Sequence, residues 1–345
     1  MSTDAAPRTS ASRRGLGRRV VAQPVDLERP GLVEGRRVVV TGASNGLGRT
    51  LAHHLAARGA DVVLMVRNPV AGMAVADELR ATGATGDVAV EQVDVADLES
   101  VRDVVGRLTA TYGSIDGLVH NAGIGGPPER RVSRQGHELA FATHVLGPAA
   151  LSLGLLPLLE NGTTPRVVTV GSPLYRRMGM HLDLADLGAE QGYNGPAVYV
   201  RTKLAGMVLA RELDRRLDAA GSPVQSLVTY PGVARTQLQS GGATAAERAV
   251  ARLLAATMAR PLEDATLPTL YAVTAPEAER DRLIGPGGPR RRPVVVSERH
   301  LGDVGDPGVG GALWEAARRA VAAHVDTWPP VLEGGRRPVG AAGPR

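Results

Sequence analysis

The chain has 345 residues, of which 43% are apolar and 22% charged, a composition typical of a globular protein with a substantial core. Cysteine is absent, which excludes disulfides and thiolate chemistry. The formal net charge is +5, but the arginine clusters at 13–19 and 290–292 have no aromatic neighbours, so no nucleic-acid partner is expected.

The two ends of the chain differ from its middle in composition and in the structure they predict. Residues 1–34 are basic and interrupted by proline and glycine, which predicts a flexible N-terminal leader. Residues 35–330 are expected to form a single domain, followed by a C-terminal tail at 331–345. No run reaches the ~18 to 20 apolar residues of a membrane span, and the N-terminus lacks an apolar signal core. We therefore expect a cytoplasmic protein with no membrane span.

Strand-like and helix-like segments alternate from residue 36 onward. Strands are predicted at 36–42, 60–68, 88–95, 115–123, 166–172 and 224–232. Helices are predicted at 48–59, 71–83, 97–113, 135–160, 196–219 and 311–324. A substrate lid is expected at 233–262 and a Gly/Pro/Arg-rich loop at 283–311. Because several strands are apolar throughout, we predict an α/β fold: a single doubly wound parallel sheet of the Rossmann type, with about seven strands and helices on both faces.

The turn "TGASNGLG" (41–48) follows the first strand and opens the first helix. Glycines here let backbone approach a pyrophosphate that sits on the helix N-terminus, so the turn predicts a dinucleotide site, although its spacing is TGxxxGxG and not GxGxxG. The residues assigned to this turn are Gly42, Ser44, Asn45, Gly46, Leu47 and Gly48.

The ends of the next strands favour NADP(H) over NAD(H). An acidic residue after the second strand would bind a ribose 2′-hydroxyl, but this chain has Arg67, whose planar fork suits a 2′-phosphate. Asp94 and Val95 are expected to flank the adenine. The small-residue loop Asn121, Ala122 and Gly123 is expected beside the ribose and nicotinamide.

A tyrosine and a lysine in "AVYVRTKLAG" (197–206) suggest proton chemistry. Tyr199 and Lys203 are four residues apart on a predicted helix and share one face. Lys203 is the only lysine in the chain, where every other cationic side chain of the Lys/Arg class is arginine. This bias indicates a site that requires a compact ammonium.

The ordered set of motifs resembles the short-chain dehydrogenase/reductase family. The matches are "TGASNGLG", "DV" at 94–95, "NAG" at 121–123, Ser172 after the fifth strand, "YVRTK" and "PGVART" at 231–236. The likeness is strong over 36–240 and weaker to about 325. There "LPTLYAVTAPEAE" resembles retinol-dehydrogenase-like members, as does "HLDLADL" between Ser172 and Tyr199.

The resemblance implies an NADP(H)-dependent oxidoreductase that interconverts a ketone or aldehyde and an alcohol. It assigns proton transfer to Tyr199 and substrate orientation to Ser172. It implies that the charge of Lys203 favours the phenolate form of Tyr199 and that Lys203 also binds the nicotinamide ribose. The residues implied around the nicotinamide are Pro231, Gly232, Val233 and Thr236. The resemblance also implies a lipophilic or polycyclic substrate, and a homodimer or homotetramer formed in part by the helix at 135–160.

One residue departs from the family pattern. In "FATHVLG", His144 stands where the family commonly has an asparagine that links the lysine to solvent through a water. His144 is therefore expected either to keep a modified proton relay or to mark a non-redox reaction such as an isomerisation, dehydration or cyclisation. A third hypothesis is a catalytically silent nucleotide-binding regulator. No histidine has metal-ligand spacing with carboxylates, so no metal is expected.

Overall fold

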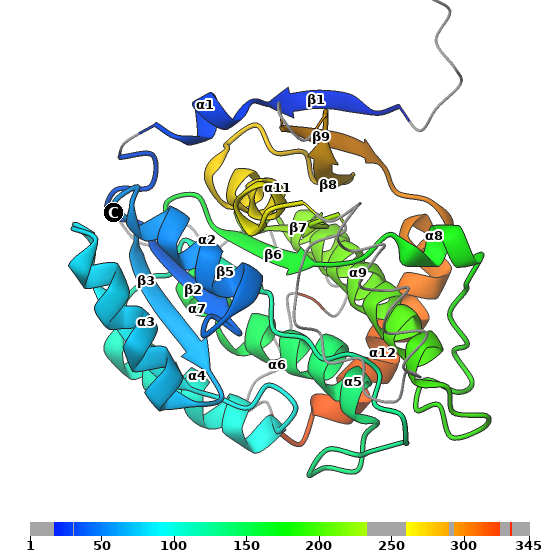
Figure 1. The fold of residues 1–345 in the computed structure, drawn as a ribbon. Helices are drawn as coiled ribbons and strands as arrows, with labels where there is room; N and C mark the ends of the chain where they lie inside the picture. The colour runs from blue at the N-terminus through cyan, green and yellow to red at the C-terminus, as the bar shows by residue number, and fades with distance from the viewer. Residues whose placement is uncertain (1–16, 30, 233–259, 290–292, 325–331, 333–345) are drawn as a thin grey trace, which may run out of the picture.

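A nine-stranded sheet forms the centre of the described part of the chain in a computed structural model, which describes residues 17–29, 31–232, 260–289, 293–324 and 332 (Figure 1). The strand order is β1-β9-β8-β7-β6-β5-β2-β3-β4. The strands are β1 (Arg19–Ala22), β2 (Arg37–Thr41), β3 (Asp61–Val66), β4 (Val88–Gln92), β5 (Gly117–His120), β6 (Arg166–Val170), β7 (Gln225–Thr229), β8 (Arg282–Gly287) and β9 (Val294–Arg299). Strands β2 to β8 run parallel; at one edge β9 pairs antiparallel with β8, and β1 pairs antiparallel with β9. The predicted doubly wound α/β fold is confirmed.

Helices cover both faces of the sheet (Figure 1). They are α1 (Pro24–Leu27), α2 (Gly46–Ala56), α3 (Pro69–Ala81), α4 (Leu98–Thr111), α5 (Leu139–Phe141), α6 (Gly147–Gly154), α7 (Leu156–Glu160), α8 (Leu174–Met178), α9 (Gly195–Ala219), α11 (Leu262–Thr274) and α12 (Pro307–Val321), with a π-helix at Ala142–Leu146 and a 3-10 helix at Gly302–Gly305. Alternate residues of each strand point to opposite faces, so Val39 packs with α4, α6 and α9, while Val38 and Val40 pack with α2, α3 and α11.

Part of the expected leader is ordered. The sequence predicts flexibility through residue 34, yet Arg19–Ala22 forms β1 and pairs antiparallel with β9. The side chains of Leu27 and Val33 are buried, and Arg19 makes an ion pair with Glu279. The prediction was wrong over these residues because their apolar side chains find a sheet edge and a core that local composition does not indicate. Leu332, expected in the tail, is likewise buried.

The expected loop at 283–311 contains two strands and the start of α12. Its first segment, RLIGPG, has the glycine and proline that usually mark turns, but it forms β8 beside β7. Gly285 is required there, because an added Cβ would lie 2.0 Å from the ring of Tyr230. The second segment, VVVSER, is β-branched and forms β9. The loop prediction was wrong because tertiary packing overrides the local turn signals.

The expected helix at 135–160 is divided into four segments. A π-helix, which is rare and frequently found at functional sites, occupies Ala142–Leu146. Gly147 follows it, and a Cβ there would lie 1.9 Å from the carbonyl oxygen of Val95. Prolines then start α6 and α7. The close contact with Val95 therefore explains the glycine that matches the family pattern.

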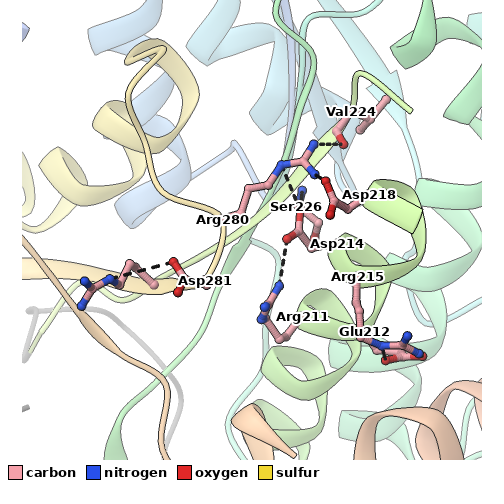
Figure 2. Close-up of polar contacts among 10 residues, drawn as sticks. Arg211, Glu212, Asp214, Arg215, Asp218, Val224, Ser226, Arg280 and Asp281 are labelled. Atoms are coloured by element: carbon pink, nitrogen blue, oxygen red, sulfur yellow. Dashed lines mark hydrogen bonds and ion pairs between the residues drawn. The ribbon is translucent and has the colours of Figure 1, made fainter. Parts of the chain in front are cut away.

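The long helix α9 is fastened to the sheet by a buried carboxylate (Figure 2). Asp214 is 1% exposed. It accepts hydrogen bonds from the Ser226 backbone N–H at 3.0 Å and from Arg211 at 2.9 Å. Arg280 binds the nearby Asp218 and the carbonyl of Val224. These contacts hold the C-terminal half of α9 against β7, which fixes the axis of the helix that carries Tyr199 and Lys203.

The surface expected for oligomerisation is covered within the chain. The apolar side chains of α6 are buried, and α12 lies across α9 and the π-helix with Leu313 and Trp314 in the core. Arg216 of α9 stacks over Trp314 at 4.6 Å. The apolar character of this segment is therefore used in packing the monomer. Among the described residues, no helix has both the length and the apolarity that crossing a bilayer requires.

Candidate active site

The carboxyl ends of β2 and β5 are neighbours, and the chain leaves them toward opposite faces of the sheet. A ligand crevice forms at such a switch point in doubly wound folds. The loops that leave these two strands contain Gly42 and Asn121. The topology therefore brings two of the predicted motifs together.

The glycine-rich turn is packed closely at Gly42 and Gly48, whereas Gly46 has open space where a Cβ would lie. Gly42 has φ +66°, and an added Cβ would lie 2.9 Å from Cα of Ala122. At Gly48, inside α2, a Cβ would lie 2.4 Å from the carbonyl oxygen of Gly42. Asn45 precedes α2 and its side chain makes no capping hydrogen bond, which leaves the first N–H groups of the helix uncapped by that side chain. Ser44, Gly46 and Leu47 lie in the same turn and are half-buried.

Thr41, which the sequence analysis did not assign to the site, fastens this turn to the β5 loop. Its Oγ1 accepts hydrogen bonds from the backbone N–H groups of Asn121 and Ala122, both at 3.0 Å, and donates to the carbonyl of Val119 at 3.1 Å. The Asn121 side chain returns a hydrogen bond to the Thr41 carbonyl at 2.9 Å. The sequence signal that could have identified Thr41 is its position as a polar residue at the end of an apolar strand.

The residues expected around the adenosine lie where predicted strands end. Arg67 directly follows β3 and is exposed, and no ion pair or hydrogen bond of its guanidinium occurs with the described residues. Asp94 is half-buried and accepts from the Ala96 N–H at 3.0 Å, while Val95 is buried. The glycine turn and the uncapped start of α2 fit the pyrophosphate of a dinucleotide.

Lys203 is placed between three motifs. Its Nζ donates to the carbonyl of Val170, at the end of β6, at 3.0 Å. A Cβ on Gly123 would lie 3.3 Å from the same Nζ, so the ammonium lies against the NAG loop. Burial lowers the pKa of Lys203 from 10.5 to about 8. The ammonium is therefore retained at neutral pH although its environment disfavours charge.

Tyr199 lies one turn before Lys203 on α9 and is largely buried. Burial raises its pKa above the ordinary value of 10.0. The ammonium of Lys203 does not reverse this effect, so the expected stabilisation of the phenolate is not seen in this structure. In this state the Tyr199 hydroxyl keeps its proton, which suits a donor more than a base.

His144 lies in the π-helix and is held by two hydrogen bonds to residues outside it. Its Nε2 accepts from the Ile124 N–H at 3.1 Å, so the proton is assigned to Nδ1, which lies 2.9 Å from Oγ1 of Thr202. Thr202 in turn donates to the Val198 carbonyl at 2.9 Å. Burial, and secondarily Lys203, holds the pKa of His144 well below 6.5. The imidazole is therefore neutral, and it meets the Tyr199 ring only edge-on, with centroids 5.9 Å apart.

Two further predicted groups lie at the ends of β6 and β7. Ser172 is half-buried, and its Oγ accepts a hydrogen bond from the Leu174 N–H at 3.4 Å. Pro231 and Gly232 follow β7, and Gly232 has φ +75°. Val233 and Thr236, together with most of the expected lid at 233–262, lie outside the described residues. Thr202, between Tyr199 and Lys203 in sequence, was missed because only its contact with His144 distinguishes it.

Comparison with known proteins follows the same motifs. Residues 36–246 match the family model described as short chain dehydrogenase. The chain is 36% identical over 219 residues to retinol dehydrogenase 14 of Mus musculus, an alignment that covers 61% of this chain and 64% of that protein. It is 34% identical over 293 residues to polyprenol dehydrogenase of Mus musculus, with 84% of each chain covered.

Solved structures give the same result. A protein of uncharacterised function from Mycobacterium paratuberculosis superimposes with a TM-score of 0.66 at 31% identity, over 84% of this chain and 94% of that one. A proposed NAD(P)-dependent gluconate 5-dehydrogenase from Beutenbergia cavernae, solved with NADP at low occupancy, gives a TM-score of 0.58 at 28% identity, over 74% of this chain and 97% of that one. The chain therefore belongs to the short-chain dehydrogenase/reductase family, in its retinol-dehydrogenase-like branch.

Proposed function

We propose that this protein is an NADP(H)-dependent oxidoreductase that interconverts a ketone or aldehyde and the corresponding alcohol. The observation that carries the proposal is the position of Lys203. Its ammonium lies against Gly123 of the β5 loop and binds the Val170 carbonyl, two residues before Ser172. Three motifs far apart in sequence thus meet beside Tyr199 at the edge of the sheet where a dinucleotide fits.

Backbone groups of the glycine-rich turn and the start of α2 would hold part of the cofactor. The turn at 42–48 and the start of α2 suit the pyrophosphate, and Arg67 suits the 2′-phosphate of NADP(H). Asp94, Val95 and the loop 121–123 would hold the adenine and ribose, and Pro231, Gly232, Val233 and Thr236 the nicotinamide end. When bound, NADP(H) supplies hydride to the carbonyl carbon or accepts it from the alcohol.

Tyr199 is assigned the proton. Its hydroxyl donates to the oxygen that becomes the alcohol during reduction, because a donor aimed at developing negative charge stabilises the transition state. Ser172 would orient the same oxygen by a hydrogen bond from Oγ. Lys203 supplies a fixed positive charge behind Tyr199. Burial raises the pKa of Tyr199, so the hydroxyl carries its proton at neutral pH and can donate it during reduction.

His144 is assigned a positioning role and no proton transfer. Both of its ring nitrogens are engaged, one by the Ile124 N–H and the other by Thr202. It therefore joins the loop after β5, which contains Gly123, to α9, which carries Lys203. This assignment supports the redox function over the non-redox alternative that His144 raised.

The substrate class is proposed from the relatives' names. Retinol and polyprenol dehydrogenases act, by name, on lipophilic alcohols, so we propose a lipophilic or polycyclic carbonyl or alcohol here. A homodimer or homotetramer stays a prediction, and because α12 packs on α9 and α6 within the chain, an interface there would involve α12 as well.

The test is turnover by the full chain. NADPH consumption is followed with all-trans-retinal, decanal and a polycyclic ketone, and Tyr199→Phe is compared with Tyr112→Phe, which alters a phenol on the far end of α4. Turnover that falls by about 100-fold or more in the first variant alone supports the proposal. Unchanged turnover in Tyr199→Phe contradicts it. Product formed without NADPH consumption indicates a non-redox enzyme, and NADPH binding without turnover a regulator.

A further inference from the structure

A buried carboxylate outside the family motifs joins the two ends of the active site. Glu298 lies in β9 opposite Leu283 of β8, and its side chain is 6% exposed. One carboxylate oxygen accepts a hydrogen bond from the Tyr230 hydroxyl at 2.5 Å. The other accepts from Arg176 at 3.2 Å. A buried carboxylate with two partners is a costly group to keep, so it requires a reason.

The first arm of this network fixes the exit of β7. Tyr230 immediately precedes Pro231 and Gly232. Its backbone N–H donates to the Ile284 carbonyl at 2.9 Å, and its ring lies over Gly285 of β8. With the hydroxyl held by Glu298, the phenol is fixed at both ends. The backbone that starts the Pro231–Gly232 turn is therefore set by contacts to β8 and β9.

The second arm fixes the segment after Ser172. Arg176 lies in α8, which begins two residues beyond Ser172. Besides Glu298, its guanidinium donates to the Arg299 carbonyl at 3.1 Å and to the Tyr175 hydroxyl at 3.2 Å. The chain that leaves β9 runs down beside α8 in Figure 1, consistent with these contacts. Helix α8 has only five residues and buries Tyr175 in the core, so the bonds of Arg176 and the packing of Tyr175 together set its position.

We propose that Glu298 is a positioning residue that holds the Ser172 segment and the Pro231–Gly232 turn at a fixed separation. Strands β8 and β9 thereby become part of the active-site support through Glu298, which acts by way of Tyr230 and Arg176. The role rests on the proposed function for its catalytic meaning, because Ser172 orients the substrate there and Pro231–Gly232 faces the nicotinamide. The mechanical link itself does not depend on that function.

The test separates the two arms in the full-length protein. Tyr230→Phe removes one hydrogen bond to Glu298, Arg176→Met removes the other, and Glu298→Gln keeps the shape of the side chain but removes its charge. Arg177→Met is the matched control, because Arg177 is the exposed neighbour on α8. Amide hydrogen exchange of the protein without cofactor is measured in peptides that cover 172–178 and 229–232.

The single variants Tyr230→Phe and Arg176→Met are each expected to raise amide exchange in only one of the two segments, a divided exchange pattern. Tyr230→Phe raises exchange at 229–232 alone by about three- to tenfold, the effect of one lost hydrogen bond. Arg176→Met raises exchange at 172–178 alone and by at least as much, because its guanidinium makes three hydrogen bonds. Glu298→Gln raises both, and the control raises neither. With decanal and NADPH as probes, Arg176→Met lowers kcat with an unchanged NADPH Kd, whereas Tyr230→Phe raises that Kd.

The inference is overturned if a variant raises amide exchange equally throughout the protein. It is also overturned if no variant changes the exchange. A wild type that shows the divided exchange pattern but neither binds NADPH nor reduces any carbonyl overturns the proposed function and leaves the link in place. A divided exchange pattern in which both single variants raise the NADPH Kd and lower kcat together overturns the catalytic assignment of the two arms.

Discussion

Replacing Lys203 by methionine is expected to stabilise the protein while removing its activity. The pKa of Lys203 falls from 10.5 to about 8 because the ammonium is buried. That difference makes the charged side chain cost about 3 kcal/mol of folding stability at pH 7. Methionine fills similar volume without charge, but it leaves the Val170 carbonyl without its hydrogen bond, which offsets about 1 kcal/mol. The net gain is about 2 kcal/mol.

The sign of the pH dependence follows from the same shift. Between about pH 8 and 10.5 the unfolded chain binds a proton at Lys203 that the folded chain does not. The wild type therefore becomes more stable relative to Lys203→Met as the pH rises through this window, whereas below pH 8 the full cost is present. We expect Lys203→Met to have a Tm about 4 °C higher at pH 7 and to lose that advantage by pH 10.

The assay is thermal unfolding of both proteins without cofactor at pH 7, 8.5 and 10. Because Lys203 is the only lysine, incorporation of ¹³Cε-lysine gives a single lysine resonance that reports this pKa directly. A variant less stable than the wild type at pH 7, or a Tm difference that stays constant from pH 7 to 10, would refute the reasoning. A lysine that titrates near 10.5 would do the same.

Three further changes test other parts of the structure. Arg67→Ala is expected to lower the preference for NADPH over NADH by about 10- to 100-fold, measured as the ratio of Kd values, while the exposed Arg102→Ala leaves the ratio unchanged. His144→Asn should leave the pH profile of kcat unshifted, since burial keeps the imidazole neutral; a lost or displaced limb would show that His144 transfers a proton. Burial raises the pKa of Asp214, so its stabilising contribution is present below pH 3.8 and is lost as the pH rises through the folded value. The Tm of Asp214→Asn minus that of wild type should therefore increase from pH 4 to 7, and a decrease would contradict the assignment.

Local signals predicted the sheet and much of the site. β-branched runs such as RVVVT at 37–41 have no polar face, which is enough to indicate strands buried on both sides. The glycines at 42–48 mark the turn, and the four-residue spacing of Tyr199 and Lys203 places both side chains on one helical face. Parallel strands joined by right-handed crossovers then bring these motifs to the same edge without further information.

Contacts between distant residues were beyond the reach of the sequence. Strand β8 contains glycine and proline and reads as a loop, but Gly285 makes room for Tyr230, 55 residues earlier in the chain. The spacing of Glu298 and Arg176 gives no sign that they meet. The partners of His144 likewise become known only when the β5 loop and α9 are packed around it.

The sequence by itself thus determined the fold class, the dinucleotide turn and the Tyr199–Lys203 pair, because each depends on the spacing of neighbouring residues. Only the tertiary structure decided the directions in which the pKa values of Tyr199 and Lys203 shift, the hydrogen-bond partners of His144, and the contacts of Glu298 with Tyr230 and Arg176. Charge burial and hydrogen-bond partners depend on the groups that surround a side chain in three dimensions, and spacing along the chain does not specify them.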